Sequence, residues 1–221
     1  MLKDKIEQDY QILKNEIETF VEDFRADDEI TRKVDKYYKG IQVFFSPLIY
    51  KPKVMFIGIN PGAGFYNENN RPVKRYSPLE NNEYYHYDYR LAQQTQKLFE
   101  MSGLGKEELK STVKTNCFFF ATKNQKELFQ MLSHLKSKKV YIKSAEWTDR
   151  LVDLVKPEII ICEGKSAFER FLEKKDHSRM DCGKVLYSDY KGAKVIGYRR
   201  NFSNISHIEE VATVLKDSFK R

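Results

Sequence analysis

Residues 53–64 read KVMFIGINPGAG, an apolar run that ends at Gly58 and passes through Asn60 into a turn of small residues. A near-continuous apolar run of this length is typical of a central parallel strand that is covered on both faces. The Asn60 amide stands at the expected carboxyl end of this strand, where open α/β sheets bind their ligands. Asn60 could hold a water molecule through its side-chain oxygen, or it could simply begin the turn before Pro61.

Strand-like and helix-like segments alternate along the chain from residue 53 onward. Strands are predicted at TNCFFFAT (115–122), PEIIICEG (157–164), KVLYSDY (184–190) and AKVIGYR (193–199), and helices at 88–101, around 128–135 and 147–155, after 164, and at 208–219. This alternation predicts an α/β fold, a three-layer α/β/α sandwich with a central, mostly parallel sheet. The segment 62–88 is long, polar and rich in tyrosine, and a loop of this length is usually functional or disordered.

The N-terminal residues have a different pattern. Apolar residues recur at spacings of three and four over 2–25, which predicts an amphipathic helix, and a second helix is expected to end near Gly40. We expect residues 1–40 to form a helical cap and residues 41–221 to form the main α/β domain.

Composition sets the broad class of the protein. The chain has 221 residues, a formal net charge of +7 and a pI near 9.1, which permits a polyanionic partner. Cys117, Cys162 and Cys182 are an odd number without CxxC spacing, so we expect buried thiols in a reducing compartment, no metal and no cofactor. No apolar run is long enough to cross a membrane, and we expect a cytoplasmic monomer.

The sequence also carries an ordered set of motifs. FIGINPG (56–62) is neither a dinucleotide-binding nor a P-loop motif, but it is similar to the first motif of the uracil-DNA glycosylase superfamily, especially its mismatch-specific and single-strand-selective branches. NFSNISH (201–207) resembles the Asn-Pro-Ser-Gly-Leu-Ser-Arg segment of the mismatch-specific enzymes. TNCFFFAT resembles the strand that presents a pyrimidine-reading Asn, and PEIIICEGKSAFERF (157–171) resembles the strand and helix before the last motif. Their order and spacing agree with the superfamily over roughly residues 50–220.

This resemblance implies roles for the residues around the first motif. Asn60 would position the water that attacks C1′ of a nucleotide flipped out of DNA. Asn116 would read the edge of a pyrimidine, although a strand-edge Asn bonded to the backbone is a similarly good interpretation. The remaining expected base contacts are Gly58, Ile59, Pro61, Gly62 and Phe65. Phe65 is the favoured stacking residue among the aromatic candidates Phe65, Tyr66, Tyr76, Tyr84 and Tyr85.

The last motif would contact DNA. Ile205 falls where the superfamily places an apolar wedge that fills the gap left by the flipped base, although it could instead belong to the core face of the final helix. Ser203 and Ser206 would bind phosphates through hydroxyl and N–H groups. The other expected DNA-binding residues are Arg199, Arg200 and Asn201, and the two arginines could equally form a solvated turn.

Departures from the superfamily pattern keep other functions open. Phe202, Asn204 and His207 replace a proline, a glycine and an arginine, and the His-Pro-Ser form of the motif is absent. An Asn cannot act as a general base, so we expect slow catalysis. The leading hypothesis is a base-excision glycosylase acting on single- or double-stranded DNA. The alternatives are a nucleic-acid-binding member of the fold without activity, or an enzyme that acts on free nucleosides or nucleotides.

Overall fold

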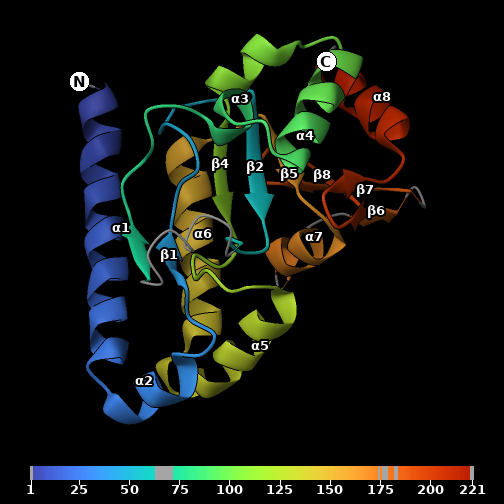
Figure 1. Ribbon diagram of the computed structural model, residues 1–221. Helices are drawn as coiled ribbons and strands as arrows, with labels where there is room; N and C mark the ends of the chain where they lie inside the picture. The colour runs from blue at the N-terminus through green and yellow to red at the C-terminus, as the bar shows by residue number, and fades with distance from the viewer. Residues whose placement is uncertain (1, 63–71, 174, 176–178, 182–183, 220–221) are drawn as a thin grey trace. The chain divides into compact units, whose positions relative to one another are not determined.

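The computed structural model describes residues 2–62, 72–173, 175, 179–181 and 184–219 (Figure 1). The chain forms two compact units. The helical unit comprises Met1–Phe44, Asn60–Ser77 and Asn116–Val155, and the sheet unit comprises Phe45–Ile59, Pro78–Thr115 and Lys156–Arg221. The predicted boundary at residue 40 stays a prediction.

A six-stranded sheet is the centre of the sheet unit. Its order is β4 (Val113–Asn116), β2 (Val54–Gly58), β5 (Ile159–Cys162), β8 (Ala193–Tyr198), β7 (Val185–Tyr190) and β6 (Arg179–Asp181). Strands β2, β5 and β8 are parallel neighbours, and Figure 1 draws the β4 and β2 arrows in the same direction. Strands β7 and β6 complete the sheet in antiparallel fashion. Every residue of β2 and β5 is buried, as their apolar sequences predict.

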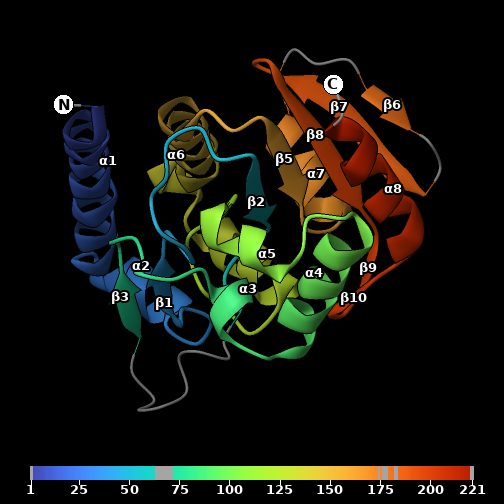
Figure 2. The same cartoon turned by 90° about the horizontal axis from the view of Figure 1, so that it is seen from above.

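Helices cover both faces of this sheet. Helices α4 (Arg90–Met101) and α8 (Ile208–Ser218) lie side by side (Figure 2) and share an apolar core with Phe56, Ile161 and Ile196 of the strands. Helix α7 (Lys165–Leu172) packs on β5 and β8. Gly197 allows this close approach, because a Cβ at Gly197 would lie 2.5 Å from Cδ2 of Phe168. The predicted α/β/α sandwich is therefore confirmed. The sheet unit also contains α3 (Glu83–His86) and a 3-10 helix over Lys106–Ser111.

The helical unit is built mainly from four α-helices of its described residues. They are α1 (Leu2–Arg25), α2 (Asp28–Val34), α5 (Gln125–His134) and α6 (Val140–Val155), with a 3-10 turn at Lys136–Lys138. Phe20 of α1 meets Trp147 of α6 edge-on at 5.2 Å between ring centroids. Strands β1 (Gly40–Gln42) and β3 (Val73–Arg75) form a small parallel pair. Helix α1 confirms the helix predicted over residues 2–25.

The strand predicted over residues 115–122 is wrong in its bounds. Strand β4 ends at Asn116, and the apolar residues that follow leave the ladder. The carbonyl of Phe119 accepts from Gln42 N–H at 2.9 Å, and the N–H of Ala121 donates to the Gly40 carbonyl at 2.9 Å. These residues are apolar because they are buried beside β1, so their pattern resembles that of a strand.

Two segments contain short elements that were not predicted. The segment 62–88 holds β3 and α3, so its described part is not a single loop. The segment after β8 folds as a hairpin of β9 (Arg200–Asn201) and β10 (Asn204–Ile205).

Candidate functional site

Asn60 follows β2 by two residues and is partly exposed. Its side-chain Nδ2 donates to the carbonyl of Pro61 at 2.9 Å, to the carbonyl of Phe120 at 3.3 Å and to Oγ1 of Thr122 at 3.1 Å. All of these partners belong to the helical unit. An amide NH₂ group carries only two hydrogens, so the three acceptor oxygens share them.

The orientation of the Asn60 amide follows from these partners. Two are carbonyls, and the Thr122 hydroxyl already donates its hydrogen to the Asn124 carbonyl at 2.8 Å. All three oxygens therefore accept, and only the NH₂ end of the amide can face them. The opposite atom, Oδ1, accepts no hydrogen bond from the residues that the structure describes. Among the described residues, Asn60 consequently presents a fixed acceptor that no donor occupies.

Thr122 is a site residue that the sequence analysis missed. It is fully buried, and it precedes Asn124, whose side-chain oxygen caps α5 by accepting from Glu127 N–H at 2.9 Å. The cap therefore holds residues 122–124 in place, and Thr122 of this segment holds the Asn60 amide. The pattern Thr-X-Asn before a helix predicts the cap, but no local pattern links Thr122 to a residue 62 positions away.

The other residues of the first motif are placed as follows. Gly58 ends β2, while Ile59 and Pro61 are buried. Gly62 is exposed and forms a parallel bridge with Thr122. A Cβ at Gly62 would meet no described atom within 4 Å, so packing among those residues does not require a glycine there.

Asn116 is the last residue of β4 and 4% exposed. The sequence analysis placed it at the start of a strand, but it stands at the carboxyl end. Its side-chain amide makes no hydrogen bond with any described residue. The base-reading role of Asn116 therefore stays a prediction.

The stacking aromatic is not found among the described candidates. Phe65 and Tyr66 lie outside the described residues, as does Cys182. Tyr84 is fully buried in the core of the sheet unit, and Tyr76 is buried in the helical unit. Tyr85 is half-buried, donates to Glu107 at 3.1 Å and lies beneath the Lys110 ammonium. The Phe65 assignment stays a prediction.

The last motif forms a tight hairpin. Asn204 pairs with Asn201 and Ile205 with Arg200, leaving Phe202 and Ser203 as the two-residue loop. Arg199, Arg200 and Asn201 are exposed, and Ser203 and Ser206 are half-buried. The Ser206 N–H donates to the Arg199 carbonyl at 2.9 Å, so this N–H is not available for the phosphate contact proposed for it.

Ile205 points into the protein in this structure. It is 5% exposed and belongs to the apolar core that α4 and α8 share with the sheet. Ile205 is therefore a core residue of β10, not a residue of the final helix as the alternative expected, and a wedge role would require it to leave that core.

A family model described as the uracil DNA glycosylase superfamily matches residues 47–212. The chain belongs to this superfamily. Membership supports a DNA glycosylase-like function at the level of the family, among the hydrolases of DNA repair, with DNA as the family's partner. Comparison with curated proteins finds no match.

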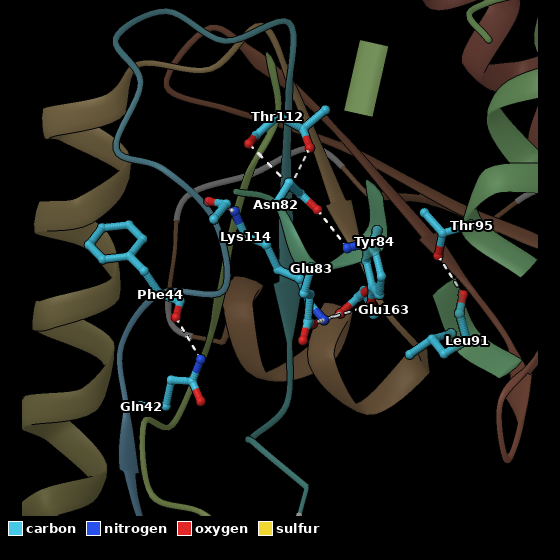
Figure 3. Close-up of polar contacts among 11 residues, drawn as sticks. Gln42, Phe44, Asn82, Glu83, Tyr84, Leu91, Thr95, Thr112, Lys114 and Glu163 are labelled. Carbon is cyan, nitrogen blue, oxygen red and sulfur yellow. Dashed lines mark hydrogen bonds and ion pairs between the residues drawn. The ribbon is translucent and has the colours of Figure 1, made fainter. Parts of the chain in front are cut away.

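This superfamily member also contains a buried ionic cluster in its sheet unit (Figure 3). The Lys114 ammonium of β4 pairs with Glu83, lies 3.6 Å from Oε2 of Glu163 and donates to the Tyr84 hydroxyl at 2.7 Å. Tyr84 in turn donates to Glu163, which directly follows β5. Burial, and then the Glu163 carboxylate, raise the pKa of Tyr84 well above its usual value. The cluster joins β4, α3 and the end of β5.

Two further features of the described residues concern cofactors and membranes. The described residues contain no group of three or more His, Cys, Asp or Glu side chains arranged to hold a metal ion. Among the described helices, none is both long and apolar enough to cross a membrane. The expectations of a monomer and of a cytoplasmic location stay predictions.

Proposed function

We propose that this protein hydrolyses the N-glycosidic bond of uracil, or of a related damaged base, flipped out of DNA. The observation that supports this most directly is the Asn60 amide, whose NH₂ end is held by three oxygens while Oδ1 is left without a described partner. A fixed acceptor of this kind can hold one hydrogen of a water molecule and so direct the water's lone pair.

In the proposed reaction the water oxygen forms a bond to C1′ while the C1′–N bond breaks. The bonding electron pair leaves with the base, and the water's surplus proton passes to the departing base anion or to solvent. Asn116 carries an amide that can accept from N3–H and donate to O4 of uracil, which orients the base. Donors to the developing anion lower the barrier.

The surroundings of Asn60 predict a slow enzyme. Its three partner atoms are two carbonyl oxygens and one hydroxyl, and none of them can take a proton at neutral pH. Catalysis would therefore rest on positioning and on stabilisation of the leaving base, without general-base assistance.

Strand cleavage after alkali tests the proposal. Labelled oligonucleotides carry one uracil, either in a single strand, opposite A, or opposite G. We expect an abasic product whose rate falls by about 10² in Asn60→Ala, because an unoriented water costs roughly that factor. Asn15→Ala is the matched control, since Asn15 is an exposed asparagine of α1.

The other outcomes separate the alternatives. Salt-sensitive DNA binding without any abasic product, across several damaged bases, would favour a non-catalytic member of the fold. Absence of both binding and cleavage would contradict a DNA substrate, and free nucleosides would be tested next.

A further inference from the structure

The turn between α5 and α6 concentrates positive charge on the surface of the helical unit. Lys136, Lys138 and Lys139 lie in this turn, which follows His134, the last residue of α5. We call residues 136–139 the basic turn. From residue 128 to residue 145 the sequence contains no Asp or Glu, so the charge of this segment is all of one sign.

A second segment of the helical unit adds a cation beside the end of α5. Helix α2 packs on α5, and Tyr37, just after α2, stacks on His134 with 6.1 Å between ring centroids. Nζ of Lys36 lies 4.7 Å from the centroid of the Tyr37 ring. Lys36 is therefore held close to the residue from which the basic turn begins, although the two segments are far apart in the sequence.

The fold uses one of these four lysines in an ion pair among the described residues. Nζ of Lys138 lies 3.5 Å from Oδ2 of Asp27, the residue that caps α2. Lys36, Lys136 and Lys139 are exposed and form no ion pair with any residue that the structure describes. Three cations of this patch are thus available to a partner.

Lys139 stands at a position where the local structure does not favour a lysine. Its φ is 53°, a left-handed value that favours glycine or asparagine. It directly precedes α6, which begins at Val140, and a cation at a helix N-terminus opposes the helix dipole. Lys136 follows the C-terminus of α5, where a cation is favourable. A partner of negative charge explains Lys139, whereas helix stability explains only Lys136.

Helix α5 connects the basic turn to the residues that hold Asn60. Thr122 accepts from Asn60, and Asn124 caps the first turn of α5. The 10 residues of α5 span about 15 Å, so the basic turn lies about that far along the helix from its Asn60 end. Duplex DNA advances about 3.4 Å per base pair, and this distance therefore corresponds to about four or five base pairs.

We propose that Lys36, Lys136 and Lys139 bind the phosphate backbone of substrate DNA about four or five nucleotides from the base held at Asn60. This inference rests on the proposed function, and it makes the substrate a polymer that extends at least this far on one side of the excised base. Ammonium groups bind phosphate without reading sequence, so the contact strengthens binding for every sequence alike. Free nucleosides and nucleotides cannot make it.

The salt dependence of DNA binding tests the contact, with Kd measured by fluorescence anisotropy on an undamaged duplex. Each lost phosphate contact lowers the slope of log K against log salt by about 0.9. For Lys136→Ala combined with Lys139→Gly we expect a slope smaller by about 1.8 than that of the wild type. Between about 50 and 200 mM salt the variant should then lose about tenfold less affinity. Glycine is chosen at 139 because it suits the φ of 53°.

Two control variants accompany this measurement. Lys136→Arg combined with Lys139→Arg keeps both charges and should keep the slope of the wild type. Lys5→Ala removes an exposed lysine near the start of α1, about 30 Å along that helix from its last residue, Arg25. We expect no change of slope for Lys5→Ala.

The position of uracil in the DNA links the contact to Asn60. In duplexes of one length, the uracil is moved from the centre towards either end. For the wild type we expect kcat/KM to fall about tenfold once fewer than about four base pairs remain on one of the two sides. The variant with Lys136→Ala and Lys139→Gly should show no such difference between the sides.

The two readouts separate failure of this contact from failure of the proposed reaction. A smaller slope without any abasic product would support the DNA-binding surface and contradict the glycosylase reaction. An unchanged slope would overturn the proposal. So would an equal dependence on uracil position in the wild type and the variant, since the lysines would then hold some other polyanion.

Discussion

At the scale of single residues, the state of Asn60 depends on atoms that are distant in the sequence. The apolar run and the following turn predicted the end of a strand and an amide beyond it, and the structure places both there. The carbonyl of Phe120 and the hydroxyl of Thr122, which fix the amide, lie 60 and 62 positions away. A turn residue and a water-positioning residue can share one local sequence. The hydrogen bonds show how the amide is held, and the water-positioning role stays a prediction.

Thr122 provides a test of this arrangement. Thr122→Val keeps the shape of the side chain but removes the oxygen that accepts from Asn60 Nδ2. The remaining two carbonyls would still hold the amide, so we expect a partial loss of glycosylase kcat, about tenfold, with little change in KM. Steady-state kinetics on uracil-containing DNA would measure it.

Thr122→Ser is the matched control because it retains the hydroxyl, and it should keep most of the activity. Equal activity of the Val and Ser variants would show that the hydroxyl does not orient Asn60.

Asn116 and Ile205 are both buried in the structure. The base-reading role of Asn116 stays a prediction, while Ile205 lies in the core of the sheet unit. A short motif gives the order of residues but not which apolar side chain of a hairpin faces inward. The inward direction of Ile205 is set by its contact with α4, which the motif does not contain.

At the scale of elements, the sequence predicts the covered strands and the long helices, because their periodicities are set by burial on one or two faces. The apolar residues 117–122 show the limit of that reasoning. They are buried against β1 rather than in the central sheet, and burial alone produced the pattern of a strand. Elements of two or three residues, such as β9 and β10, are too short to show a period.

The buried ionic cluster links three elements of the sheet unit and predicts a large stability effect. Lys114→Met leaves the Glu83 and Glu163 carboxylates buried without their cation. We expect the free energy of unfolding to fall by about 3–5 kcal/mol. Urea denaturation followed by circular dichroism would measure the change.

The control for Lys114 is a charge-neutral version of the cluster. Lys114→Met combined with Glu83→Gln and Glu163→Gln should recover much of the loss, since no unpaired charge then remains buried. A loss below about 1 kcal/mol for the single variant would contradict a role for the cluster in stability.

At the scale of the whole molecule, buried tyrosines link stability to alkaline pH. Tyr38 in the helical unit is 3% exposed, and its hydroxyl has no hydrogen-bond partner among the described residues. Burial raises the pKa of Tyr38 to about 12 from the model-compound value of 10.0. In the sheet unit, burial likewise raises the pKa of Tyr84 and of Tyr198.

The sign of the effect follows from these directions. Below pH 10 Tyr38 is neutral in both the folded and the unfolded chain, so its full contribution to stability is present. As the pH rises from 10 towards 12, the unfolded chain loses the proton first and the folded state is destabilised. At about pH 11 the loss from Tyr38 alone should be about 1.4 kcal/mol.

Tyr38→Phe isolates this contribution, because the ring keeps its contacts with Phe24 and Phe120 while the ionisable group is removed. Between about pH 9 and pH 11 we expect the variant to lose about 1.4 kcal/mol less unfolding free energy than the wild type, measured by urea denaturation. At neutral pH it should be as stable or slightly more so, since the hydroxyl it lacks is buried without a described partner. Parallel pH profiles for the two proteins would mean that Tyr38 ionises as easily in the folded chain as in the unfolded one, and the alkaline sensitivity would then have to come from the sheet unit's tyrosines.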